Sequence, residues 1–237
     1  MADPLLYLPI ATTGLSFVFA AILLRRYRAK RRGAHLLWWA FGVLVYGLGT
    51  LAESATSVIG WHEGVFRAWY ICGALLGGAP LAQGTVYLLL RRRTAHVLTA
   101  LLATFAIVAS AFVVAAPVDA AGTAAHVLSG DVFQWPWVRL LPPFINTYAL
   151  VFLVGGAALS AWRYRSRREA RHRLVGNVFI AVGALLPGIG GAFTRFGHTE
   201  VLYVTELVGL LLIYVGYRCN VRTPPALAAD AMERRAA

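Results

Sequence analysis

The alternation of apolar and basic segments constrains the fold of this chain more than any other feature of its sequence. Long apolar stretches are separated by short runs that hold most of the arginines. Hydrophobic residues make up 59% of the chain and charged residues only 14%, and the charges are clustered instead of being spread over a soluble surface. Apolar stretches of about 20 residues are typical of helices that cross a bilayer. The pattern therefore predicts a membrane protein with several spans.

Seven apolar stretches are long enough to cross a bilayer, and each is expected to be an α-helix because lipid offers no partner for unpaired backbone groups. The expected fold class is all-α, a polytopic bundle of seven transmembrane helices. Residues 1–218 form this domain, and residues 219–237 form a short cytoplasmic tail that we expect to be disordered. The expected spans lie at roughly 4–24, 36–60, 66–90, 95–117, 141–162, 174–195 and 200–218.

The basic runs predict the orientation of the bundle. They follow the first, third, fifth and last spans, whereas the alternate connections hold only Arg67, Arg139 and Arg195. Because basic loops stay in the cytoplasm, the N-terminus is expected outside and the C-terminus inside. Contact with anionic lipid at the cytoplasmic face is expected from the same runs, so the net charge of +12 does not require nucleic acid as a partner. The first apolar stretch is followed, and not preceded, by basic residues, which favours a retained span over a cleaved signal peptide.

Two glutamates lie inside apolar spans at a similar expected depth. Glu53 falls in the outer third of the second span, and Glu206 lies just below the outer end of the seventh. An ionisable group inside a span is costly to bury and by default indicates a functional site. We therefore predict a ligand-binding pocket in the outer half of the bundle. Its candidate residues are Glu53, Arg67, Trp69, Tyr70, Asn146, Arg195, Tyr203 and Glu206.

Two other interpretations of these residues stay open. Glu53 with Arg67, or Glu206 with Arg195, would form ion pairs that only fasten helices together. Alternatively, Glu53 is protonated and makes hydrogen bonds alone, since burial disfavours a charged carboxylate. If the site is functional, we expect a ligand or a proton to change the Glu/Arg pairing and to move the sixth span near Pro187.

Small residues are regularly spaced in the third and sixth spans. Glycines recur every seven residues in the sixth span and at GxxxG spacing in the third, which favours close helix packing. Proline inside a span is expected to kink the helix, so a hinge is the alternative role. The residues that carry this packing or hinge prediction are Pro80, Gly176, Gly183, Pro187 and Gly190.

The connection at roughly 118–140 is the longest one on the expected outer side. Its aromatic residues Phe133, Trp135 and Trp137 lie close to Asp131 and Arg139. Such a composition is typical of a segment that lies in the membrane interface. It is expected to act as an aromatic anchor, or as a lid over whatever the spans enclose.

Several classes of protein are excluded by what the sequence lacks. The only lysine, Lys30, falls in a predicted cytoplasmic loop, and a retinal Schiff base needs a lysine within a span, so retinal is excluded as a cofactor. All histidines fall in loops or at helix ends, so a bis-histidine haem is not expected. The sequence has no CxxC or HxxxH metal spacing and no GxSxG motif. We expect no metal, no cofactor and no enzymatic activity.

Four stretches resemble a known family. LLWWAFGVLVYGLGTLAESAT and FRAWYICGALLGGAPLAQGTVYLLLRRR are similar to the second and third spans of the seven-helix N-terminal input region of bacterial membrane histidine kinases. RHRLVGNVFIAVGALLPGIGGAFTRFG and LYVTELVGLLLIYVGYR resemble the last two spans of that region. The resemblance implies a sensor whose helices receive a signal and pass it to cytoplasmic output domains.

The sequence after Tyr217 departs from that family, because the remaining residues are too few for a kinase domain. We therefore expect a sensor-like protein of a bacterial plasma membrane that signals through a partner, and the preference for arginine over lysine favours a bacterial genome rich in G and C. A small-solute or ion transporter and a scaffold subunit of a membrane complex are the alternatives. A transporter needs polar groups that continue to the inner side, for which Gln83, Thr85 and Asn177 are the clear candidates.

Overall fold

The computed structural model describes residues 7–30, 33–119, 128–165 and 171–221. Within these ranges the fold is helical, and the only β-type pairing is an isolated bridge between Val118 and Phe133. Most of the predicted tail, residues 222–237, lies outside the described residues, while residues 219–221 belong to the last helix.

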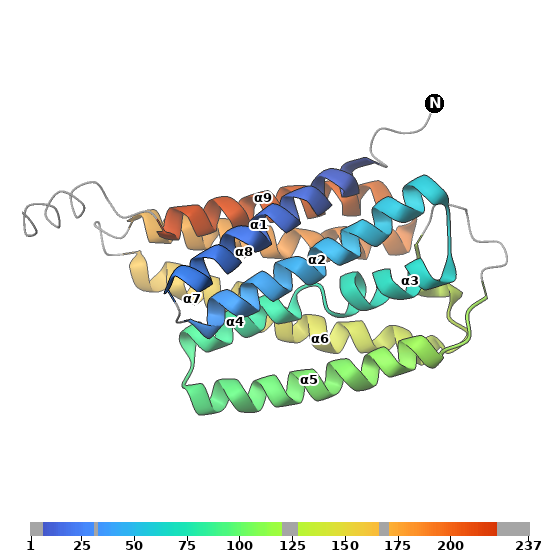
Figure 1. Ribbon diagram of the computed structural model, residues 1–237, viewed down its shortest axis with the longest axis horizontal. Helices are drawn as coiled ribbons and strands as arrows, with labels where there is room; N and C mark the ends of the chain where they lie inside the picture. Colours follow the sequence, from blue (N-terminus) through green and yellow to red (C-terminus); the bar gives the residue numbers. More distant parts are fainter. Residues whose placement is uncertain (1–6, 31–32, 120–127, 166–170, 222–237) are drawn as a thin grey trace, which may run out of the picture.

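The described part of the chain contains seven helical segments that are long and apolar enough to cross a membrane, as the sequence predicts. They run side by side along the long axis of the molecule (Figure 1). Five are single helices: α1 (Leu8–Lys30), α2 (Ala34–Ile59), α5 (Arg92–Ala115), α8 (Arg171–Phe193) and α9 (Thr199–Val221). The third and fifth segments, Glu63–Leu89 and Pro136–Tyr164, are each built from several pieces.

The observed helix ends differ from the predicted ones by a few residues. The first helix extends to Lys30, so the only lysine is the last residue of α1 and does not lie in a loop. It is nevertheless exposed at the end of the helix. Helix ends were the least predictable part of the fold because basic residues are compatible with the last turn of a helix.

The faces of α5 and α8 that point away from the bundle are apolar. Only 17% of the most apolar window of each helix is buried within the protein. Leu101 and Ile107 of α5 are 63% and 71% exposed. Exposed apolar surface on this scale needs a partner, and lipid is the partner that suits a bundle of long apolar helices. The chain is thus built as a multi-pass membrane protein.

Charge is divided between the two ends of the bundle. The C-terminal ends of α1, α4 (Ala79–Leu89), α7 (Gly155–Tyr164) and α9 lie at one end, on the left in Figure 1, which we call the arginine-rich end. The opposite half, which we call the carboxylate half, contains every Asp and Glu of the described residues. These are Glu53, Glu63, Asp119, Asp131, Glu200 and Glu206.

The third segment is interrupted where it passes the middle of the bundle. It consists of α3 (Glu63–Trp69), a π-helical turn η2 (Tyr70–Leu75) and α4 (Ala79–Leu89). The sequence predicts one helix over 66–90, and this prediction is wrong at the interruption. Gly77 and Gly78 disfavour a helix, and Pro80 fits only its first turn, so α4 begins anew at that point.

The glycines of α8 lie against α9. A Cβ atom placed on Gly183 would be 2.6 Å from the carbonyl oxygen of Gly209, and one placed on Gly176 would be 2.7 Å from that of Gly216. The ring of Pro187 also packs against Gly209, at 3.1 Å from the position of a Cβ there. Glycine at these positions lets α8 and α9 approach each other at backbone distance along this face, and no larger residue fits there.

Candidate functional site

A cavity of about 720 Å³ lies in the carboxylate half of the bundle. Its walls come from α2, the interrupted third segment, the fifth segment, α8 and α9. A volume of this size accommodates a small organic molecule. Five of the eight predicted site residues line the cavity, namely Glu53, Trp69, Tyr70, Asn146 and Glu206.

Two buried carboxyl groups face each other in this cavity. Glu53 of α2 is 2% exposed and Glu206 of α9 is 7% exposed. The two carboxyl groups interact within hydrogen-bonding reach of each other. A hydrogen bond between two carboxyl groups requires a shared proton, because carboxylate oxygens only accept. The arrangement therefore holds either one proton or a positively charged group between the two side chains.

Each carboxyl group retains an oxygen without a donor. The indole Nε1 of Trp69 donates to Glu53 Oε1 at 2.8 Å. Neither Glu53 Oε2 nor Glu206 Oε2 receives a hydrogen bond from an N–H or O–H group of the described residues. Buried polar atoms are rarely left in this state, so the two oxygens need a donor that the described residues do not supply.

Tyrosine and threonine hydroxyls hold the backbone around the carboxyl pair. Tyr46 of α2 donates to the backbone carbonyl of Glu206 at 3.1 Å and thereby ties α2 to α9. The hydroxyls of Thr13 and Thr50 hydrogen-bond at 2.9 Å and tie α1 to α2. These contacts position the carboxyl groups without neutralising them, since no cation is involved.

Irregular helix geometry forms the wall opposite the carboxyl pair. Asn146 of α6 (Leu141–Ala149) donates through its side-chain amide to the carbonyl of Ala74, 3.2 Å away in the π-helical turn η2. A second π-helical turn, η5 (Leu150–Val154), follows α6 and also faces the cavity. Such turns are frequent at functional sites, because they expose carbonyls that a regular helix would use.

The connection before the fifth segment closes one side of the cavity. Residues 129–131 and Arg139 belong to the cavity wall, and Arg139 pairs with Asp131 at 2.5 Å. Phe133 packs against the ring of Tyr70 with 4.8 Å between centroids. Trp137, by contrast, is 42% exposed. The segment thus has one face towards the cavity, as a lid requires, and another that is free to contact lipid, as an anchor requires.

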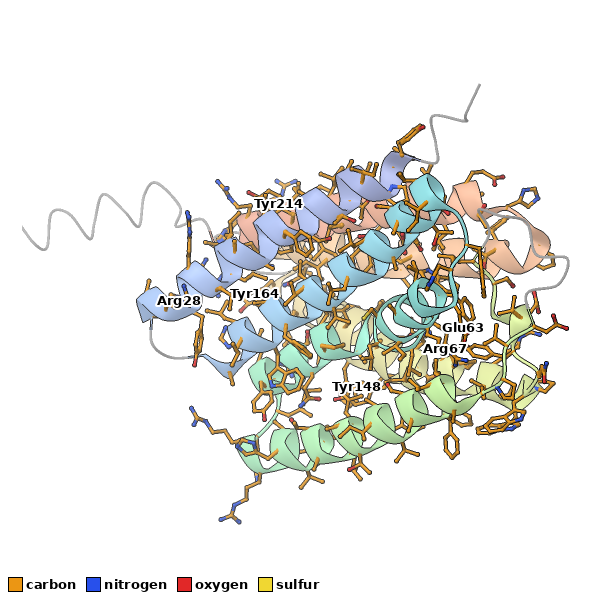
Figure 2. All side chains as sticks on the ribbon, turned by 45° about the vertical axis from the view of Figure 1, so that its right-hand side comes forward. Arg28, Glu63, Arg67, Tyr148, Tyr164 and Tyr214 are labelled. Carbon is orange, nitrogen blue, oxygen red and sulfur yellow. The ribbon has the colours of Figure 1, made fainter. Side chains whose placement is uncertain are left out.

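Arg67 does not belong to the cavity. Its guanidinium pairs with Glu63 at 2.6 Å and donates to the carbonyls of Val113, Val114 and Ala116 at the end of α5. The predicted alternative of a Glu53–Arg67 ion pair is therefore wrong. Glu63 lies one helical turn before Arg67, and this i,i+4 spacing was the signal in the sequence that identifies the true partner. Both residues lie together at the same end of the bundle in Figure 2.

The last two predicted site residues have different outcomes. Tyr203 of α9 is buried but is not part of the cavity wall. Arg195 lies in the short helix η7 (Thr194–Phe196), and its side chain is outside the described residues, so its pairing with Glu206 stays a prediction. Tyr46, Asp131 and Arg139 line the cavity although the predicted site omits them.

Gln83 has a structural role. It is fully buried, and its amide donates to the Ala95 carbonyl at 3.1 Å and to the Thr99 hydroxyl at 2.7 Å. Its side-chain carbonyl accepts from the hydroxyl of Tyr148. All polar atoms of Gln83 are thus satisfied within the protein, and the residue fastens α4 to α5 and α6.

A second cavity, of about 480 Å³, lies at the arginine-rich end. Thr85 and Asn177 line it, as do several basic residues. Leu81, Leu153 and Ile213 belong to the walls of both cavities, so an apolar partition separates them. Among the described residues, no group of three or more His, Cys, Asp or Glu side chains is suited to hold a metal ion.

Comparisons of the chain with protein-family models, with curated proteins and with solved structures returned no match. The function is therefore inferred from the cavities and their chemistry.

Proposed function

We propose that this chain is a receptor-like integral membrane protein that binds a small cationic ligand between Glu53 and Glu206. The observation that carries the proposal is the pair of buried carboxyl groups, each with an oxygen that lacks a donor, in a cavity of about 720 Å³. Basic residues gather at the opposite end of the bundle, and the positive-inside rule favours a cytoplasmic location for that end. The ligand then enters from the outer side of a bacterial plasma membrane.

The chemistry of the wall selects the class of ligand. Glu53 and Glu206 accept hydrogen bonds, and the rings of Trp69 and Tyr70 attract a cation through their faces. Among the described residues of the wall, the one guanidinium is that of Arg139, and it is paired with Asp131. An amine or another small organic cation with an apolar body satisfies both the carboxyl groups and the largely apolar remainder of the cavity.

The resemblance to the input region of histidine kinases supports a role in signalling. A cation that replaces a shared proton between Glu53 and Glu206 is larger than the proton and therefore moves α9 and α2 apart at one point. Because α9 contacts α8 at backbone distance along Gly183 and Gly176, a shift of α9 is transmitted along α8 towards the arginine-rich end. A partner protein at that end receives the signal. The sequence-predicted mechanism is modified in one respect, since the two carboxyl groups replace the Glu53–Arg67 pair.

Native mass spectrometry of the protein extracted gently from its membrane tests this function. Small molecules released from the wild type are identified and compared with those released from the double variant Glu53→Gln and Glu206→Gln. Glu200→Gln is the matched control, because Glu200 lies on the same helix but has a side chain that is 45% exposed and contacts His198 at 3.0 Å. We expect a cationic molecule in the wild type and the control, and none in the double variant. Retention by the double variant would refute the proposed site.

A transporter is the second candidate, and one observation favours it. The two cavities extend from opposite ends and share Leu81, Leu153 and Ile213, so a shift of these side chains would connect them. Thr85 and Asn177 are polar residues of the second cavity, on the other side of this apolar partition. A transporter predicts Glu53-dependent uptake of an amine probe, methylammonium, into proteoliposomes, whereas a receptor predicts binding without uptake.

A further inference from the structure

The second cavity combines an apolar interior with a basic rim. It lies between α1, α2, α4, α7 (Gly155–Tyr164), α8 and α9. Its interior is lined by apolar side chains that include Leu36, Val43 and Leu153. The basic residues of its wall come from α1, α2, α7 and α8, and they are Arg26, Lys30, His35, Arg163 and Arg173.

No carboxylate of the described residues balances these charges, because every one of them lies in the other half of the bundle. Arg26 donates to the hydroxyl of Tyr217 at 3.3 Å, and Arg173 donates to that of Tyr164 at 3.2 Å. Both guanidiniums also lie over the rings of these tyrosines, at 5.6 and 5.5 Å from the centroids. Tyrosine orients a guanidinium but does not neutralise it, so no described residue offsets the positive charge of the rim.

We propose that this cavity binds an anionic phospholipid, with the phosphate at Arg26 and Arg173 and the adjoining chain in the apolar interior. Guanidinium groups match the geometry of phosphate oxygens and form paired hydrogen bonds with them. Basic pockets between transmembrane helices are recurrent sites for anionic head groups. A free phosphate ion shares the chemistry of the rim but makes no use of the apolar interior.

Asn177 and Asn220 supply further polar contacts at the same rim. The amide of Asn220 donates to the side-chain carbonyl of Asn177 at 3.2 Å, which links α9 to α8 beside the cavity. A lipid bound there contacts both members of the closely packed α8–α9 pair. The bound phosphate therefore holds together the end of the bundle at which α1, α8 and α9 meet.

The binding test uses the full chain in a neutral detergent and three probes. The first is short-chain phosphatidylglycerol, the second is the matched phosphatidylcholine, and the third is inorganic phosphate. We expect phosphatidylglycerol to raise the midpoint of thermal unfolding in a saturable way, and the other two probes to leave it unchanged at the same concentration. Inorganic phosphate that binds as tightly as phosphatidylglycerol would overturn the assignment to a lipid.

Two pairs of substitutions distinguish the effect of the cavity wall on lipid affinity from the effect of general surface charge. The double variant Arg26→Gln and Arg173→Gln removes two guanidiniums of the rim. Arg28→Gln with Arg92→Gln removes the same charge from exposed positions at the same end, outside the cavity wall. We expect the first variant to bind phosphatidylglycerol about 10- to 100-fold more weakly than the second.

Equal loss in both variants, or no loss in either, would overturn the proposal. If the double variant does not fold, the single variant Arg173→Gln is measured in its place, because Arg173 is exposed and its substitution does not disturb the interior. Replacement of Arg26 and Arg173 by lysine keeps the charge but removes the paired hydrogen bonds. It is expected to give an intermediate affinity.

Discussion

Trp69→Phe is the substitution that most directly tests the geometry of the carboxyl pair. Trp69 Nε1 donates to Glu53 Oε1 at 2.8 Å, and Glu53 is 2% exposed, so water does not replace the lost donor. A hydrogen bond to a charged group contributes about 1.5–3 kcal/mol. For a chain of this size, that loss lowers the midpoint of thermal unfolding by about 3–12 °C. Phenylalanine keeps an aromatic ring in the cavity wall, so most of the packing is retained.

Thermal unfolding in detergent, followed by the loss of secondary structure, measures the effect. Trp38→Phe is the matched control, because Trp38 is half-buried and stacks on Tyr87 with 6.4 Å between ring centroids. We expect the control to change the midpoint much less than Trp69→Phe does.

A double-mutant cycle isolates the contact itself. Trp69→Phe and Glu53→Gln are measured singly and together, and residues that contact each other show coupling of about 0.5–3 kcal/mol. The single Glu53→Gln variant keeps an oxygen that accepts from the indole but has no negative charge. We expect the loss caused by Trp69→Phe to be smaller in the Glu53→Gln background. Additive effects would refute the proposed hydrogen bond and, with it, the orientation of Glu53 in the cavity.

Two further substitutions test the packing of the helices. Gly183→Ala places a Cβ at 2.6 Å from the Gly209 carbonyl oxygen. The two helices α8 and α9 must then separate by about 0.4–0.8 Å to reach a contact of 3.0–3.4 Å. We expect the free energy of unfolding, measured by thermal unfolding, to fall by about 1–3 kcal/mol. Gly188→Ala meets nothing within 4 Å and should stabilise α8 by about 0.5–1 kcal/mol. Arg67→Met removes the donor to three carbonyls, and we expect it to lower the free energy of unfolding by about 1–3 kcal/mol in the same assay. Glu63→Gln changes an acid that is 56% exposed, so we expect it to lower that free energy by less than about 1 kcal/mol.

The number of spans and the depth of the carboxyl groups were predictable from the sequence. Span number follows from the length of each apolar run, and depth follows from the helical rise per residue. Glu53 and Glu206 lie in different spans at a common depth, and the structure brings them together. Their direct contact was not predictable, because it depends on the rotation of α2 and α9 about their axes, which packing decides.

Rotation also explains where the prediction of the site was wrong. Arg67 lies at the same end of the bundle as Glu53, but its position on α3 directs it to Glu63 and to the end of α5. Tyr203 lies less than one turn from Glu206 and is nevertheless outside the cavity wall. Depth thus limits the candidates, and only the packing of neighbouring helices selects among them.

The interruption of the third segment was indicated by Gly77, Gly78 and Pro80, but its form was not. A sequence of this kind is compatible with a kink, a hinge or a complete break, because glycine and proline only weaken the regular helix. The carbonyl of Ala74 in the π-helical turn is satisfied by Asn146 from another segment. Such a partner is distant in the sequence, so the shape of this wall of the cavity depends on tertiary structure.

The charges of the two cavities argue for a receptor and against a simple carrier. A cation held by Glu53 and Glu206 that moved towards the arginine-rich end would first cross the apolar partition formed by Leu81, Leu153 and Ile213. It would then meet the guanidiniums of the rim, which no carboxylate of the described residues pairs with and which repel a cation. An anion entering from the other end would meet the two carboxyl groups in the same way. Each cavity therefore suits a ligand that the other repels, which supports the proposal of two separate binding sites over that of one continuous pathway.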